Sequence, residues 1–245
     1  MSQTFVSVPK IISAFTLAEV LITIGIIGVI AAMTLPSLIA DYQKKQTVTQ
    51  LKKSYSIISQ ALTASQYENG DMAEWGMNNI GDANGNFWGN YKVIVSAFVN
   101  KYFIPYLNVQ GDCGIKCNRQ KGIKRYRLNG DLWLWNDDSN YVVYLADGTI
   151  VSFMFDNING ILQWVYLYVD INGDKKPNIS GKDIFTFSFY SDTNKINMAG
   201  VGKTRSELLG TSRPGCNKNA GSYAGDYCGA VIQYDNWEIK DDYPW

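Results

Sequence analysis

Oxygen-bearing side chains alternate along the stretch from Asp170 to Asp174, the strongest candidate for chemistry in the chain. Asp170, Asn172 and Asp174 are each separated by one residue, so a single turn could direct several hard oxygen ligands toward one point, which suits Ca²⁺. The loop is not an EF-hand, because Lys175 stands where the glycine belongs and Gly181 where the bidentate Glu belongs. An ion-free hairpin rich in Asx turns is the alternative, since Asp and Asn favour turns by themselves.

Patterns typical of enzymes are missing from the sequence. Histidine is absent, which removes the commonest general base and metal ligand, and no nucleophile elbow, P-loop or zinc signature occurs. The carboxylate pairs Asp137/Asp138 and Asp241/Asp242 are adjacent, so their side chains point in different directions. The 22 Lys and Arg residues balance 22 Asp and Glu residues, which gives no basic surface for nucleic acid. We therefore expect neither an enzyme nor a nucleic-acid partner.

The cysteines are even in number and all follow the N-terminal apolar segment; they are Cys113, Cys117, Cys216 and Cys228. Without histidine nearby, disulfides outside the cytosol are favoured over zinc. Four cysteines allow three connectivities, which sequence alone leaves open. We favour the two local bridges, Cys113–Cys117 and Cys216–Cys228.

An apolar segment near the N-terminus organises the rest of the chain. After Glu19, no charged residue occurs until Asp41, and about 20 apolar residues suffice to cross a bilayer as a helix. A carboxylate within such a helix costs roughly 2.5–3.5 kcal/mol or more, so Glu19 is expected to have a partner and a function. An ordinary single-pass anchor explains the length of this segment but leaves Glu19 unexplained.

The residues Phe15-Thr16-Leu17-Ala18-Glu19 resemble the leader junction of type IV pilins and type II secretion pseudopilins. The resemblance covers roughly residues 14–60 and implies that a prepilin peptidase cleaves between Ala14 and Phe15 and methylates the new amine. Glycine is the usual residue before the cut, so Ala14 departs from the pattern while keeping a small side chain. Pro36 matches the proline that kinks the helix in this family.

The resemblance also implies a partner for Glu19, namely the Phe15 amine of a neighbouring subunit in a filament. It implies a structural subunit of a pilus or secretion pseudopilus, which resides as a single-pass protein in the inner membrane before assembly and in an extracytoplasmic filament afterwards. Its partners would be related pilin subunits, the peptidase and an inner-membrane assembly platform. A minor tip pilin acting as an adhesin or DNA-uptake component is the alternative, and an anchored ectodomain is a third. In the calcium loop, the resemblance adds Asp183 as the closing carboxylate.

The spacing of apolar residues predicts an α+β fold in which a long N-terminal helix packs on an antiparallel sheet, similar to the pilin α/β roll. We expect a leader over 1–14, a helix over 15–69 and an extracytoplasmic head over 70–245. Within the helix, 15–40 forms the membrane or filament part and 41–69 is amphipathic. The segment 91–107 fits a helix or a strand, and we favour a helix that ends near Pro105. A short helix is expected from Cys228. Strands are predicted at 132–135, 141–145, 149–155, 162–169, 184–190 and 195–198.

Overall fold

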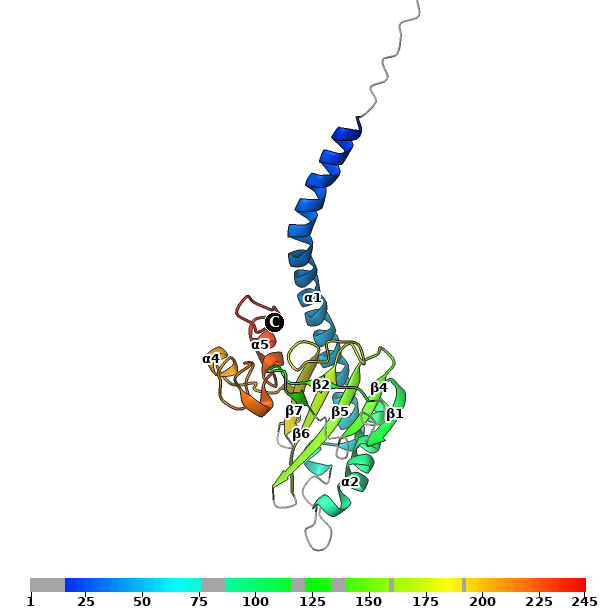
Figure 1. Cartoon of the computed structure of the whole chain (residues 1–245). Coiled ribbons are helices and arrows are strands. Elements are labelled where there is room, and N and C mark those ends of the chain that lie inside the picture. Colours follow the sequence, from blue (N-terminus) through cyan, green and yellow to red (C-terminus); the bar gives the residue numbers. More distant parts are fainter. Residues whose placement is uncertain (1–15, 76–86, 116–121, 134–139, 159–160, 191–192) are drawn as a thin grey trace, which may run out of the picture. The chain divides into compact units, whose positions relative to one another are not determined.

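The computed structural model describes residues 16–75, 87–115, 122–133, 140–158, 161–190 and 193–245 (Figure 1). The chain divides into two compact units, Met1–Gln43 and Lys44–Trp245, and helix α1 (Leu17–Asn69) runs through the boundary between them. The second unit contains an antiparallel β-sheet on which helices pack. The α+β class with a long apolar N-terminal helix is therefore confirmed.

Within the first unit, α1 is apolar on every side. The large aliphatic side chains from Leu17 to Ile39 are exposed, including Ile22 at 63% and Ile27 at 65%. By length and composition, α1 is the one helix among the described residues that could cross a membrane. The helix continues through Pro36, although this residue has no backbone N–H to donate to the preceding turn.

The main sheet has six strands in the order β1-β4-β5-β6-β7-β8, and each neighbouring pair is antiparallel. The strands are β1 (Val109–Ile115), β4 (Tyr141–Leu145), β5 (Ile150–Ile158), β6 (Ile161–Asp170), β7 (Ile184–Tyr190) and β8 (Asn197–Met198). A separate ladder joins β2 (Arg125–Tyr126) to β3 (Leu132–Trp133). Short helices α4 (Arg205–Leu208) and α5 (Cys228–Tyr234) follow β8.

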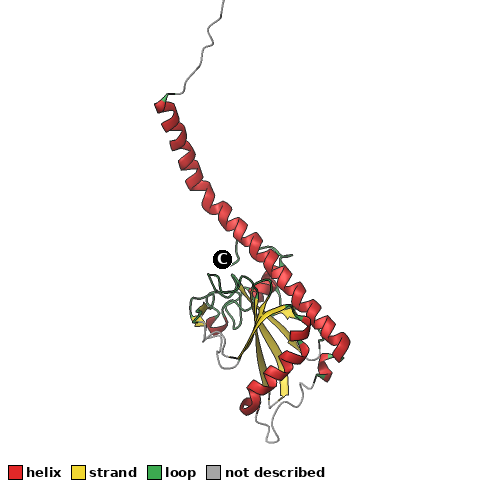
Figure 2. Ribbon diagram, turned by 90° about the vertical axis from the view of Figure 1, so that its right-hand side faces the viewer, coloured by secondary structure: helices red, strands yellow, loops and turns green. Residues whose placement is uncertain are grey.

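One face of the sheet is covered by the second part of α1 together with α2 (Phe87–Tyr102), as Figure 2 shows. The predicted stripe on α1 is confirmed, because Leu51, Ile58 and Leu62 are buried in this core. Aromatic rings fill the interface: Phe98 lies edge-on to Phe155 with 5.2 Å between the ring centroids. Burying each such side chain stabilises the fold by roughly 1.5–3 kcal/mol.

Strand β7 is buried on both faces, apart from its last residue. Phe185, Phe187 and Phe189 point into the core beneath the helices, while Thr186 and Ser188 alternate with them and are also buried. The cover over the second face comes from β2, β3 and the chain after β8. This second cover forms the pocket described below.

The structure differs from the predicted elements mainly where local periodicity was weak. The helix predicted over 91–107 is α2 followed by a 3₁₀ turn at Ile104–Tyr106, because Pro105 follows the end of α2. The strand predicted at 132–135 pairs only with β2, outside the main sheet. Strand β1 lies in a segment where no strand was predicted. The helix predicted from Cys228 is confirmed as α5.

Candidate functional site

Glu19 has partners within its own chain, because it completes a capping box at the start of α1. The backbone N–H and the hydroxyl of Thr16 both donate to Glu19 Oε2 at 2.8 Å, and the Glu19 N–H donates to Thr16 Oγ1 at 3.2 Å. Such a box satisfies two backbone donors that a helix start leaves unpaired. These contacts are hydrogen bonds from an uncharged residue, so Thr16 supplies no positive charge to Glu19.

The predicted assembly segment also includes Ala14, Phe15 and Pro36. The predicted cleavage and methylation positions, Ala14 and Phe15, lie outside the described residues. Pro36 lies inside the exposed apolar part of α1. Near it, the hydroxyls of Thr34 and Ser37 donate to backbone carbonyls of the same helix at 3.0 and 2.9 Å, which keeps these polar groups satisfied in an apolar segment.

A buried guanidinium lies beside the predicted calcium loop. Arg125 Nη2 lies 3.4 Å from Asp170 Oδ2 and 3.7 Å from Asp174 Oδ1, and the Arg125 side chain is only 1% exposed. Asp170 is fully buried, which raises its pKa well above the usual range even though Arg125 opposes the shift. The cation in contact with these two carboxylates is therefore an arginine from β2.

Asp183, the expected closing ligand, is occupied by other donors. Its Oδ1 accepts from the backbone N–H of Ile179 at 2.6 Å, and its Oδ2 accepts from the N–H of Asn178 at 2.7 Å and from Asn172 Nδ2 at 3.2 Å. These bonds fold the loop back on itself, because Asp183 accepts from residues that lie four and five positions earlier in the chain. Burial raises the pKa of Asp183.

The four side chains predicted to hold calcium, Asp170, Asn172, Asp174 and Asp183, contact protein partners in the structure. Within the described part of the chain, no three acidic, histidine or cysteine side chains gather closely enough to hold a metal. The buried oxygens Asp170 Oδ1 and Asn172 Oδ1 do have no hydrogen-bond partner, but a guanidinium beside them repels a divalent cation. Calcium stays a prediction, which a chelation experiment decides.

One predicted disulfide is present. Cys216 and Cys228 are bonded and buried, which confirms the favoured local pairing at this pair. The predicted Cys113–Cys117 bridge lies outside what the structure describes, since Cys117 falls between described segments.

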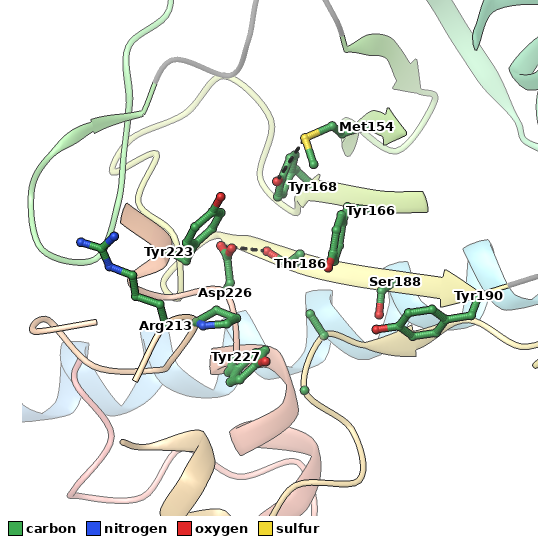
Figure 3. Close-up of a pocket in the computed structure, with 13 residues that line it drawn as sticks. Met154, Tyr166, Tyr168, Thr186, Ser188, Tyr190, Arg213, Tyr223, Asp226 and Tyr227 are labelled. Carbon is green, nitrogen blue, oxygen red and sulfur yellow. Dashed lines mark hydrogen bonds between the residues drawn. The ribbon is translucent and has the colours of Figure 1, made fainter. Parts of the chain in front are cut away.

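A pocket with a volume of about 250 Å³ lies on the sheet face opposite α1 and α2 (Figure 3). Its floor follows the register of the sheet: Tyr166 on β6 is directly opposite Ser188 on β7, and Tyr168 is opposite Thr186. On β5, Met154 pairs with Tyr166. Tyrosine rings and small hydroxyl side chains therefore lie side by side across neighbouring strands.

The facing wall of the pocket comes from the segment closed by the disulfide. Two wall residues, Arg213 and Pro214, come shortly before Cys216 in the chain. Two others, Asp226 and Tyr227, come directly before Cys228. Tyr223 stands in the same segment. Close backbone contact holds the wall in place, because the Gly225 N–H donates to Gly215 O at 2.8 Å, and a Cβ at Gly225 would lie 2.5 Å from Ser180 Oγ.

Asp226 lies at the junction of floor and wall. Its Oδ1 accepts from Arg127 Nη1 at 2.5 Å and from the Thr186 hydroxyl at 3.2 Å. The Arg127 guanidinium stacks 3.6 Å from the centroid of the Trp133 ring. Burial raises the pKa of Asp226 to about 6, although Arg127 lowers it. The charge of Asp226 is thus balanced inside the protein.

Sequence reasoning missed both the capping box and this pocket. The capping box has a recognisable signal, Thr16 followed three residues later by Glu19. The pocket had a weaker signal: the outward positions of β6 and β7 carry tyrosine, threonine and serine instead of Lys or Glu. That choice is unusual for a solvated strand face.

The comparison with family models gives a match over most of the chain. No curated protein and no solved structure matches the chain. A model described as a family of unknown function (DUF6613) matches residues 37–245, which covers the second part of α1, the sheet and the whole pocket. The chain therefore belongs to the DUF6613 family.

Proposed function

We propose that this protein is a structural subunit of a type IV pilus or a type II secretion pseudopilus, assembled through its N-terminal helix. The observation that carries the proposal is the first part of α1, whose large aliphatic side chains are exposed on all sides. A helix that is hydrophobic all round is stable only inside a membrane or among other apolar helices. The membrane surrounds this helix before assembly, and the apolar helices of other subunits surround it in the filament core afterwards.

Glu19 favours a filament over a permanent anchor. Its hydrogen bonds to Thr16 shape the helix start, but a carboxylate in an apolar environment also needs an opposite charge. Lysines within the second unit are separated from Glu19 by the uncharged segment that ends at Asp41. A neighbouring subunit's Phe15 amine, created by cleavage after Ala14, supplies the charge and fixes the register between subunits.

This function needs partners and no catalysis by the chain itself. A prepilin peptidase removes residues 1–14, an inner-membrane platform extracts the subunit, and related pilin subunits pack against α1. The head stays extracytoplasmic, which agrees with the disulfide between Cys216 and Cys228. The family match begins at residue 37, so the proposal depends on the N-terminal residues of this chain.

A minor tip subunit is the second candidate, and the pocket on the sheet favours it. A subunit that only stacks into a filament has no use for a solvent-accessible pocket that displays several tyrosine rings. A tip subunit that binds a ligand needs such a pocket.

Mass spectrometry of the protein from its native membrane tests the proposal. We expect a mature chain that begins at Phe15 with a methylated amine, and a chain that retains Met1 in assembled material would refute it. The stoichiometry of purified filaments then separates the two candidates: a major subunit dominates the filament, whereas a tip subunit is rare.

A further inference from the structure

We propose that the pocket between the β5–β7 face and the disulfide-closed segment binds one neutral sugar residue. The site is built by Tyr166, Ser188 and Tyr190 from the sheet, and by Asp226 and Tyr227 from the wall (Figure 3). All of its residues lie in the second unit, so the inference stands whether or not the chain assembles into a filament.

Size and access favour a small ligand. A volume of about 250 Å³ is below the roughly 300–1,000 Å³ of pockets for drug-sized molecules, so the pocket suits one ring-sized group. Two of its tyrosines remain open to solvent, with Tyr190 41% and Tyr223 47% exposed. A ligand can therefore enter from solution, and a longer chain attached to that ring can continue outside.

The lining matches both surfaces of a sugar ring. Tyrosine offers a rigid apolar ring and a polar tip at low entropic cost, which complements the C–H face and the hydroxyl edge of a pyranose. Ser188 stands between Tyr166, its cross-strand partner, and Tyr190, its neighbour on the same face of β7. Hydroxyl and carboxylate groups thus lie beside ring faces, as a ligand with alternating apolar and polar surfaces requires.

The charges argue against an ionic ligand. Asp226, the carboxylate in the lining, already accepts from Arg127 and Thr186, so a quaternary ammonium would meet a balanced charge with a guanidinium directly behind it. Arg213 is exposed, and its guanidinium points away from Tyr166, Tyr190 and Tyr227 in Figure 3. Among the described residues that line the pocket, an anion therefore finds no inward-pointing cation. A phenyl side chain from a peptide would place an apolar ring beside the buried Ser188 hydroxyl, which costs free energy.

Saturation-transfer NMR on the full chain tests the proposal. The protein is kept in a polyoxyethylene detergent, which carries neither a sugar nor an ammonium group. The probes are the methyl glycosides of glucose, galactose, mannose and N-acetylglucosamine, with tetramethylammonium and N-acetyl-tyrosinamide as competitors. We expect saturable binding of at least one glycoside that neither competitor displaces. The proposal would be overturned if no glycoside saturates the protein at concentrations up to about 50 mM. It would also be overturned if either competitor displaces a bound glycoside.

Variants place the ligand in this pocket. Tyr190→Ala removes an exposed ring at the rim and should weaken glycoside binding about three- to tenfold, and Ser188→Ala should weaken it in the same direction. Tyr234→Ala is the matched control, because Tyr234 is also exposed, at 56%, and lies outside the pocket. Unchanged near-ultraviolet circular dichroism establishes that each variant is folded. Binding that is equal in folded Tyr190→Ala and wild-type protein would refute the assignment.

Discussion

Replacing Glu19 with glutamine separates the two functions that this residue can have. Glutamine keeps the capping box, because its amide oxygen accepts the same two bonds from Thr16 that Glu19 Oε2 accepts at 2.8 Å. It removes the negative charge. If Glu19 serves only to start the helix, the variant should behave like the wild type; if it neutralises a neighbouring amine, assembly should fail.

The expected magnitudes differ enough to decide between these outcomes. Removing one member of a buried ion pair costs about 3–5 kcal/mol, which at 1.4 kcal/mol per tenfold is roughly a hundred- to several-thousandfold in the equilibrium for adding each subunit. Loss of a capping side chain costs about 0.5–2 kcal/mol. The matched variant Thr16→Ala removes the cap and keeps the charge, so it should reduce filament yield far less than Glu19→Gln.

The assay measures filaments and membrane-inserted protein separately. Filaments sheared from cells are quantified by immunoblotting and electron microscopy, and inserted subunits are quantified after carbonate extraction of membranes. Mass spectrometry of the N-terminus of each variant establishes that cleavage still occurs, which matters because Thr16 is adjacent to Phe15. Wild-type filament yield from Glu19→Gln, or an equal loss from Thr16→Ala, would refute the charge-pairing argument.

Three further predictions concern the head. EDTA decides the calcium prediction: a fall in melting temperature on chelation would support the ion, and an unchanged melting temperature would count against it. Arg125→Ala should lower the free energy of unfolding by about 3–5 kcal/mol, because it leaves Asp170 without its ion-pair partner. Changing Cys216 and Cys228 together to Ala should cost about 2–3 kcal/mol in urea denaturation, given the short loop that they close, and an unchanged midpoint would contradict this. Because burial raises the pKa of Asp226 to about 6, the folded state binds this proton more tightly than the unfolded chain, so the contribution of Asp226 to stability falls by up to about 3 kcal/mol as the pH rises from about 4 to 6. Asp226→Asn should flatten that slope, and parallel stability curves for variant and wild type would count against it.

Local periodicity explains what the sequence could predict. The stripe of Leu51, Ile58 and Leu62 recurs with the period of a helix, and burial of all three follows directly from that spacing. The alternation in β7 likewise predicts a strand. That alternation does not reveal that Thr186 and Ser188, on the other face of the strand, are buried as well, because the chain after β8 covers them.

Distance along the chain explains what the sequence could not predict. Asp170 pairs with Arg125, which lies 45 residues earlier, and Asp226 pairs with Arg127, 99 residues earlier. No spacing rule connects such residues. Arg125 meets Asp170 because β2 lies against the β6–β7 turn, and Arg127 meets Asp226 because the chain after β2 lies against the disulfide-closed segment. The calcium interpretation used only the residues within the loop, so it had no means of placing a guanidinium there.

The proposed assembly segment and the sugar pocket can be tested against each other in one set of proteins. Glu19 lies in the first unit and before the family match, whereas every pocket residue lies in the second unit and within residues 37–245. Glu19→Gln should therefore abolish filaments and leave glycoside binding intact, whereas Tyr190→Ala should weaken glycoside binding and leave filaments intact. Loss of both properties in either variant would mean that the helix and the head are energetically coupled, and the two proposals would then have to be replaced by a single one.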